Sequence, residues 1–178
     1  MGVQVMVLVL KRTALFVFIV LVWALLTAVA TYAAPTEVTG FEGFAPGTIV
    51  VKTHERRLYY VLSGNRALRF PVGVGRSGMQ WTGEAHIEGK YVRPAWAPPP
   101  LIRRENPRLP AVIPGGAPNN PMGVAALTLR GGKYAIHGTN RPSSVGRFVS
   151  HGCIRMYNRD IVELFRMVSV GTPVIVQR

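Results

Sequence analysis

The chain has 178 residues, which allows one domain of ordinary size together with a processing signal. Its formal net charge is +13 at pH 7, from 21 lysines and arginines against 8 acidic residues. The basic residues are scattered and no nucleic-acid-binding motif is present, so the sequence argues against a nucleic acid partner and favours an anionic membrane face or an anionic polymer outside the membrane.

The N-terminal segment has the pattern of an export signal. Lys11 and Arg12 precede an apolar run from Thr13 to Ala30, and Thr31-Tyr32-Ala33 then offers small residues at the −3 and −1 positions of a cleavage site. We predict that residues 1–33 are a signal peptide. An uncleaved anchor is the alternative, because a run of about 18 residues is just long enough to span a bilayer. Both predictions place the remaining chain in the periplasm or cell envelope and limit membrane contact to this segment.

A short segment at 34–46 contains glycine and proline and is expected to be a loose lead-in to a single domain at 47–178. Short runs of β-branched and aromatic residues follow, separated by turn residues such as Ser63-Gly64-Asn65. This spacing is typical of an antiparallel sheet. The predicted strands are Thr48 to Thr53, Leu58 to Leu62, Ala67 to Gly73 and Ala85 to Val92.

The segment from Arg93 to Pro121 differs in kind. Nine of its 29 residues are prolines, so no regular ladder of strands is expected to run through it. A loop of this length in a compact domain is usually either a functional lid or disordered. Because Trp96, Leu101 and Ile102 offer apolar side chains to pin it to the domain, we expect an ordered cover over a cleft, with disorder as the alternative.

Two runs, Val124 to Arg130 and Lys133 to His137, flank Gly131-Gly132 and predict a tight hairpin. The hairpin ends at His137, and a rigid strand end can aim that side chain at a substrate.

A helical pattern follows residue 157. Asn158 or Asp160 is expected to cap the helix, with Glu163 completing a capping box. Gly171 is expected to end it, and Val174 to Val176 to form a last strand. The apolar residues recur at helical spacing, so one face is expected to pack on the sheet: Ile161, Leu164, Phe165 and Val168.

The loop between His137 and Arg155 is rich in Gly, Ser and Pro and holds the only cysteine of the chain, Cys153. Two of the four histidines, His137 and His151, lie in the same stretch. An unpaired thiol in an oxidising compartment cannot be an internal disulfide, and with imidazoles nearby it is a candidate nucleophile. An imidazolium within hydrogen-bonding distance would hold it as a thiolate, lowering its pKa from about 8.5. Spacing alone leaves open which histidine does so.

Two other uses of these residues compete with the nucleophile. A lone cysteine is often a buried, inert side chain. His137, His151 and Cys153 could also ligate zinc, although they lack a clear fourth ligand and a nearby acidic residue to act as base. Gly152 favours the nucleophile, because a glycine there lets the chain turn so that the N–H groups of Gly152 and Cys153 converge on an oxyanion. We therefore expect no metal and no cofactor.

The run Ser150-His151-Gly152-Cys153-Ile154-Arg155-Met156, with His137-Gly138-Thr139 upstream, resembles the active site of the YkuD-type L,D-transpeptidases. The resemblance covers about residues 47–177 and includes Asn120 to Gly123, Pro142 to Gly146 and Gly171 to Val174. It implies a mostly-β fold, a YkuD-like β-sandwich with one helix in the C-terminal region and a long Pro-rich loop.

The same resemblance implies a role for each residue of the loop. The position of Cys153 is the family's nucleophile and that of His137 its general base. The backbone carbonyl of Gly138 would orient the imidazole. His151, together with Ser150, would then fix the loop rather than act on the substrate.

Arg155 projects two residues beyond the nucleophile. Its planar guanidinium suits a carboxylate, and the resemblance implies a substrate carboxylate near this position. A salt bridge to Asp160 or a solvated side chain is the alternative.

The resemblance also implies a bacterial enzyme that acts on peptidoglycan stem peptides, with effects on cell wall organisation and cell shape. Cys153 would attack the third residue of a tetrapeptide donor, release D-alanine and form a thioester. The side-chain amine of a neighbouring stem would resolve this thioester into a 3→3 cross-link. A carbapenem is expected to acylate the same sulfur. The alternatives are hydrolysis of the same bond (an L,D-carboxypeptidase) or of a lipoprotein-linked bond, and a non-catalytic cell-wall-binding protein.

Overall fold

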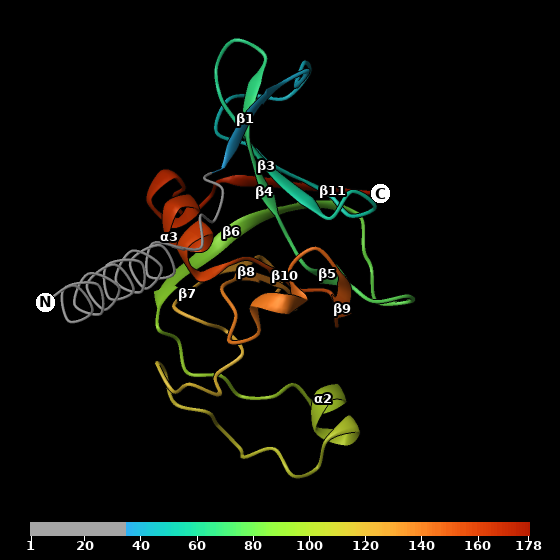
Figure 1. The fold of residues 1–178 in the computed structure, drawn as a ribbon, viewed down its shortest axis with the longest axis vertical. Helices are drawn as coiled ribbons and strands as arrows, with labels where there is room; N and C mark the ends of the chain where they lie inside the picture. The colour runs from blue at the N-terminus through green and yellow to red at the C-terminus, as the bar shows by residue number, and fades with distance from the viewer. Residues whose placement is uncertain (1–34) are drawn as a thin grey trace, which may run out of the picture. The chain divides into compact units, whose positions relative to one another are not determined.

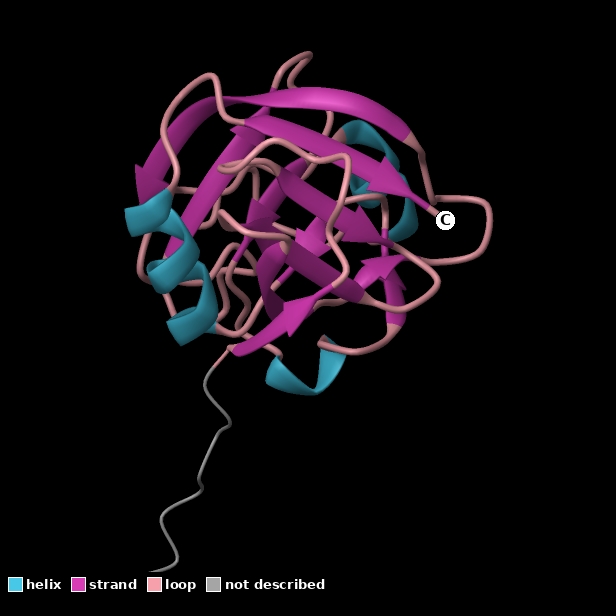
Figure 2. Ribbon diagram, turned by 90° about the horizontal axis from the view of Figure 1, so that it is seen from above, coloured by secondary structure: helices cyan, strands magenta, loops and turns pink. Residues whose placement is uncertain are grey.

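The protein is represented by a computed structural model in which residues 35–178 are described; the predicted signal peptide or anchor at 1–33 lies outside them. Strands make up most of the regular structure (Figure 2). None of the helices within residues 35–178 is long and apolar enough to cross a membrane. The helices are α2 (Pro100–Glu105), the 3-10 helix η1 (Pro142–Ser144) and α3 (Asn158–Met167). The strands are β1 (Thr36–Thr39), β2 (Ile49–Lys52), β3 (Arg57–Val61), β4 (Arg66–Pro71), β5 (Val74–Gly75), β6 (Gly83–Val92), β7 (Ala125–Leu129), β8 (Ala135–His137), β9 (Phe148–Ser150), β10 (Ile154–Arg155) and β11 (Pro173–Gln177).

In the described part of the chain, nine strands pair in the order β1-β4-β3-β2-β11-β6-β7-β8-β10, and β5 pairs with β9. Strand β6 links two halves of the large sheet, because its first part pairs with β11 and its second part with β7. Its register shifts between Ile87 and Gly89, where the strand passes from one half to the other. Figure 1 shows it as the long green strand between β11 and β7. The predicted mostly-β class with a sandwich fold is confirmed.

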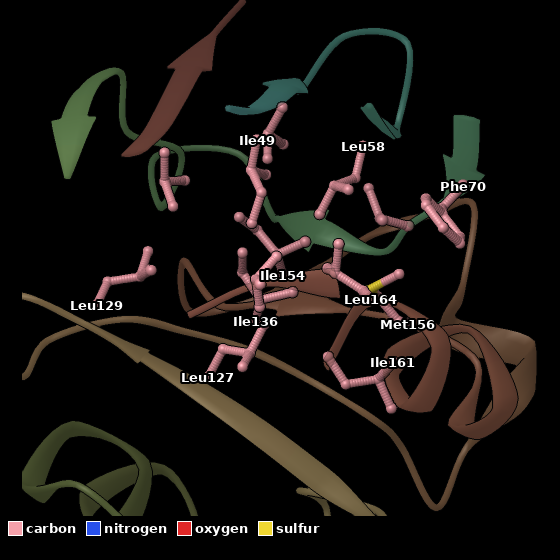
Figure 3. Close-up of a cluster of buried hydrophobic side chains, with 14 of the residues drawn as sticks. Ile49, Leu58, Phe70, Leu127, Leu129, Ile136, Ile154, Met156, Ile161 and Leu164 are labelled. Carbon is pink, nitrogen blue, oxygen red and sulfur yellow. The ribbon is translucent and has the colours of Figure 1, made fainter. Parts of the chain in front are cut away.

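The main core lies between the two halves of the sheet (Figure 3). Ile49, Leu58 and Phe70 enter it from β2, β3 and β4, and each is fully buried. The facing half and α3 contribute the other labelled side chains: Leu127, Leu129, Ile136, Ile154, Met156, Ile161 and Leu164. Burial of one such side chain stabilises the fold by roughly 1.5–3 kcal/mol, so this core holds β7, β8 and β10 firmly in place.

Strand β2 is buried on both faces, which explains its unbroken apolar run. Ile49 and Val51 face the main core, whereas Val50 joins Phe41 and Tyr59 on the outer face. Phe41 comes from the segment expected to be a loose lead-in. That expectation is corrected, because the segment contains β1, which pairs antiparallel with β4. The sequence of β1, Thr-Glu-Val-Thr, shows no apolar alternation from which a strand could have been predicted. This agrees with its position, because no residue of β1 is fully buried.

The spacing of the short strands had suggested an antiparallel sheet, but the sheet is mixed. Strand β2 pairs parallel with β11, β8 with β10, and β5 with β9. Strands β5, β9 and β10 were not predicted, because two or three residues are too few to show an alternation of side chains.

The predicted hairpin is confirmed. Strands β7 and β8 pair antiparallel, with Ala126 opposite His137. Gly131 and Gly132 form the turn with φ of 91° and 64°, values that glycine adopts without strain.

Helix α3 forms with its predicted apolar face in the core, but its ends differ from the prediction. The residue preceding it is Tyr157, which makes no capping hydrogen bond with its side chain, and the helix ends at Met167 rather than near Gly171. Asp160 is buried and bonds with Arg159 instead of capping.

The proline-rich segment 93–121, here called the lid, is held in a defined arrangement. The side-chain amide of Asn120 donates hydrogen bonds to the carbonyls of Pro94 and Pro114, each at 2.9 Å. Trp96 and Ile113 form an isolated β-bridge, which joins the parts of the lid before and after α2. The lid also contains α2, which was not predicted because the segment is rich in proline. Pro100 opens this helix, and proline is compatible with a first helical turn.

Candidate active site

The parallel pairing of β8 with β10 brings the candidate residues together. In this register Arg155 lies opposite His137, and Ile154 opposite Ile136. Cys153 comes directly before β10 and two positions before Arg155, so the two side chains leave the chain on the same side. The thiol, the imidazole and the guanidinium all line one cavity.

This cavity, the candidate catalytic cavity, has a volume of about 220 Å³. Ser150, His151, Lys133 and Tyr134 complete its polar lining. Its apolar lining comes mainly from the lid and the residue that follows it: Trp96, Pro99, Leu101, Ile102, Pro121 and Met122. The proline-rich segment therefore does cover a cleft, and that cleft contains the candidate nucleophile.

His137 is 4% exposed, and its Nδ1 lies 2.6 Å from the carbonyl oxygen of Gly138. A carbonyl can only accept, so Nδ1 carries the hydrogen and Nε2 is left as the base. Burial, helped by the positive charge of Arg155, lowers the pKa of His137 from 6.5 to about 4, while the carbonyls of Gly138 and Pro121 oppose the shift. At neutral pH the ring is therefore an uncharged base.

This shift makes a prediction for stability. The unfolded chain takes up a proton on this ring near pH 6.5, but the folded chain does so only near pH 4, because its pKa is lowered. Protons therefore favour unfolding in this interval, and folding stability falls as the pH drops from 6.5 to 4. At 1.36 kcal/mol per pH unit the loss amounts to about 3 kcal/mol. Urea unfolding of the wild type and of His137→Gln between pH 4 and 8 measures it. The two curves should be parallel above pH 7 and diverge below 6.5, and parallel curves throughout would show that the ring is not buried as a neutral base.

Burial also raises the pKa of the Cys153 thiol, which a hydrogen bond from the backbone of Ala135 and the charge of Arg155 offset only in part. Within residues 35–178, Cys153 and His137 form no hydrogen bond with one another. The resting site thus combines a protonated thiol with a neutral imidazole. This corrects the expectation of a resting thiolate, because the imidazolium that would lower the pKa of the thiol is itself disfavoured by burial.

Asn158 is a site residue that sequence analysis missed, having assigned it to a helix cap. Its Oδ1 accepts hydrogen bonds from the N–H groups of Thr139 (3.0 Å) and Val124 (3.4 Å). A Cβ on Gly138 would lie 2.3 Å from the same oxygen, so a larger residue there would displace the Asn158 amide. Asn158 therefore fixes the turn in which the Gly138 carbonyl meets the ring of His137.

Ser150 ties together the loop that carries Cys153. Its hydroxyl donates to the carbonyl of Cys153 (2.6 Å) and accepts from the N–H of Gly152 (3.1 Å). The Gly152 N–H, which was expected to face an oxyanion, is thus already engaged. The N–H of Cys153 remains as the candidate donor to that oxyanion.

Two aromatic rings lie against Gly152 in the same loop. Nε1 of Trp81 donates to the carbonyl of Gly152 at 3.0 Å. The Trp81 ring stacks on Tyr134 with centroids 4.8 Å apart and planes 3° apart. A Cβ on Gly152 would lie 2.3 Å from the Tyr134 ring. A side chain larger than that of glycine at position 152 would therefore collide with the Tyr134 ring.

His151 joins the loop to the lid. Its Nε2 lies 2.8 Å from a carboxylate oxygen of Glu105, at the end of α2, and the other oxygen of Glu105 bonds with Arg76. This partner of His151 was not predicted, and the role of His151 in fixing the loop stays a prediction. In the portion of the chain that is described, no three side chains of His, Cys, Asp or Glu gather as a metal site would require.

Arg155 presents a cationic side chain that forms no ion pair with an acidic residue in 35–178. Its Nε is buried and makes no hydrogen bond to any described residue. The alternative salt bridge to Asp160 is not formed, because that carboxylate pairs with Arg159. The backbones of Arg155 and Gly73 form two hydrogen bonds. The N–H of each residue donates to the carbonyl of the other at 2.8 Å. The side chain of Arg155 lines the cavity that also holds Cys153.

The model of one family, the YkuD L,D-transpeptidase catalytic domain, matches residues 46–176. Among similar proteins, YbiS of Escherichia coli K12, named a probable L,D-transpeptidase, is 44% identical over 135 residues, which cover 71% of this chain and 43% of YbiS. YkuD of Bacillus subtilis strain 168 is 49% identical over 134 residues, covering 75% of this chain and 67% of YkuD. The chain thus spans less than half the length of the E. coli relative but two thirds of the B. subtilis one.

Solved structures share the fold at low sequence identity. L,D-transpeptidase 3 from Mycobacterium tuberculosis superposes with a TM-score of 0.58 at 16% identity, over 74% of this chain and 60% of that one. LdtMt1, solved in complex with imipenem, superposes with a TM-score of 0.54 at 19% identity, over 72% of this chain and 57% of that one.

Proposed function

Because the chain belongs to the YkuD family of L,D-transpeptidase catalytic domains, we propose that it joins peptidoglycan stem peptides through a thioester on Cys153. The observation that carries this proposal is the shared cavity in which the thiol lies with a neutral imidazole whose tautomer is set by the Gly138 carbonyl. The high positive charge suits an anionic cell wall, and the N-terminal pattern suits export to the periplasm or cell envelope.

In the first step the sulfur attacks the carbonyl carbon of the third residue of a tetrapeptide donor. Nε2 of His137 takes the thiol proton as the carbon–sulfur bond forms, so no free thiolate is needed beforehand. The Cys153 N–H is placed to donate to the oxyanion that develops. As the carbon–nitrogen bond breaks, His137 returns the proton to the departing amine. The products are a thioester and free D-alanine.

In the second step an amine of a neighbouring stem attacks the thioester. His137 accepts a proton from that amine, the new amide bond forms, and the sulfur leaves and regains its proton. The product is a 3→3 cross-link. The lid favours amines over water because its apolar side chains line the cavity around the thioester.

A carbapenem fits the same scheme, because its strained amide would acylate Cys153 in place of the stem peptide. The imipenem complex of LdtMt1 supports this proposal for a relative with the same fold.

Product analysis tests the proposal. Purified protein is incubated with disaccharide tetrapeptides, and mass spectrometry follows D-alanine, monomers and dimers. We expect D-alanine release, dimers with one tripeptide and one tetrapeptide stem, and a one-to-one imipenem adduct on the peptide containing Cys153. Tripeptide monomers without dimers, unaffected by added amines, would indicate the hydrolase instead. Neither D-alanine release nor adduct would leave only a cell-wall-binding role.

A further inference from the structure

A second cavity, here called the β9 cavity, has a volume of about 660 Å³, which is in the range of small-molecule sites. Phe148, at the start of β9, lines it. Ser150, at the end of the same strand, lines the candidate catalytic cavity. Side chains two positions apart in a strand point to the same side. The two cavities therefore lie along one face of β9, which pairs with β5 (Figure 1).

The Phe148 ring is exposed but held in position. Cζ of Arg56 lies over the ring, 4.9 Å from its centroid. The guanidinium is itself fixed, because its Nη1 donates to the carbonyl of His54 at 2.9 Å. Even with this cover, Phe148 is 41% exposed. An aromatic ring that is already immobilised loses little entropy when a ligand packs against it, so this arrangement is pre-organised for binding.

The rest of the lining is mainly polar. Its side chains come from His54, Ser77, Gln80 and Arg178. Those of Ser77, Gln80 and Arg178 make no hydrogen bond or ion pair with any residue in 35–178, so a hydroxyl, an amide and a guanidinium are available to a ligand. The face of an aromatic ring carries partial negative charge, which disfavours an anion and favours C–H groups. A sugar ring, with C–H groups on its face and hydroxyls at its edge, matches both parts of this lining.

One wall of the β9 cavity is tied to the nucleophile loop at both of its ends. This wall is the segment 76–80, which follows β5. The N–H of Arg76 donates to the carbonyl of Ser150 at 2.9 Å. Directly after the segment, Nε1 of Trp81 donates to the carbonyl of Gly152 at 3.0 Å. A ligand in the β9 cavity is therefore held at a fixed position relative to the nucleophile.

We propose that the β9 cavity binds a sugar of the glycan strand to which the donor stem is attached. Phe148 packs against the face of the sugar ring, and Ser77, Gln80 and Arg178 bond with its polar edge. This inference rests on the proposed transpeptidase activity and deepens it, because it extends the recognised substrate from the stem peptide to the glycan.

The reach of the stem peptide agrees with this assignment. The hydroxyl of Ser150 donates to the carbonyl of Cys153 (2.6 Å), which limits the distance between their Cα atoms to about 7 Å. Phe148 lies two residues further along β9, about 7 Å away. The stem joins the glycan through its first residue, so about 10 Å of extended peptide, besides the linking lactyl group, separates the sugar from the third carbonyl. The stem is thus long enough for its carbonyl to contact Cys153 while its sugar contacts Phe148.

A comparison of two donors tests this inference. One is the disaccharide tetrapeptide, and the other is the same tetrapeptide with an acetylated N-terminus, which lacks the sugars but keeps the amide. The measured quantity is the ratio of their kcat/KM values for D-alanine release. We expect the wild type to favour the disaccharide donor about tenfold, the range that one aromatic contact with its hydrogen bonds contributes. Phe148→Ala should lower the ratio toward one, and Gln80→Ala should lower it about threefold.

Two further variants complete the design. Phe148→Trp keeps a flat aromatic face and should keep most of the ratio. Tyr91→Ala removes an aromatic ring that is 51% exposed but lines neither cavity, and it should keep the wild-type ratio. A ratio of one in the wild type would overturn the inference, as would an unchanged ratio in Phe148→Ala and Gln80→Ala, or an equal fall in Tyr91→Ala. If the wild type releases D-alanine from neither donor, the proposed function itself fails, so the two failures are distinguishable.

Discussion

Replacing Cys153 with serine is expected to lower the rate of D-alanine release from a tetrapeptide by at least about a thousand-fold. Serine keeps the size and the hydrogen-bonding group, but a hydroxyl gives up its proton far less readily than a thiol. The site makes this difference severe, because the pKa of His137 is lowered to about 4 and the ring is a weak base. Such a base can take a proton from sulfur as the new bond forms, but not from the much less acidic hydroxyl.

The measurement is D-alanine release under single-turnover conditions, with imipenem adduct formation as a second readout. Cys153 is only partly exposed and is not part of the main hydrophobic core, so the thermal unfolding midpoint of the serine variant should stay within a few degrees of the wild type. A folded serine variant that still releases D-alanine at the wild-type rate would show that another group is the nucleophile.

The rate of acylation should also depend on pH in a way that separates two mechanisms. With a neutral thiol and a neutral ring, acylation falls only as His137 gains a proton, near pH 4 in the free enzyme. A resting thiolate–imidazolium pair would instead lose activity as the thiolate gains a proton, at the pH that equals the pKa of the thiol. The position of the acidic limb for imipenem acylation, measured from pH 3.5 to 8, distinguishes them.

Local patterns predicted much of the scaffold. The hairpin of β7 and β8 follows from two apolar runs around Gly131-Gly132, and the buried face of α3 follows from apolar residues at helical spacing. Both signals depend only on neighbours in sequence, as does the loop that joins His137 to Cys153. Lone residues of unusual chemistry within one short loop are visible without knowledge of the fold.

The missing parts depend on contacts between distant segments. Glu105 lies 46 positions from His151, and Asn158 lies 19 positions from Thr139, so no local pattern pairs them. The protonation of the site was mispredicted for a related reason. Proximity of a thiol and two imidazoles suggested an ion pair, whereas burial, which the sequence does not show, disfavours both charges.

Replacing Gly152 with alanine is expected to destabilise the fold by roughly 2–6 kcal/mol and to abolish measurable transpeptidation. Gly152 has a φ of 116°, a conformation that costs an L-residue about 1–3 kcal/mol. The added Cβ would also lie 2.3 Å from the Tyr134 ring, which adds a similar cost of overpacking. The ring cannot easily move, because it stacks on Trp81, whose indole N–H is bonded to the Gly152 carbonyl. Any relief must shift the backbone that carries Cys153.

Gly146→Ala is the matched control, since Gly146 lies in the same loop with a φ of 82° but no atom within 4 Å of an added Cβ. It should cost only the backbone strain, about 1–3 kcal/mol, and leave D-alanine release close to the wild-type rate. Urea unfolding of both variants separates strain from collision. The collision is assigned to one ring by adding Tyr134→Ala, which should reduce the cost of Gly152→Ala toward that of Gly146→Ala, a coupling of 1 kcal/mol or more. If the two alanine variants lose the same free energy of unfolding in the wild-type background, Tyr134 moves aside for the added Cβ. The loop before Cys153 is then less rigid than its contacts imply.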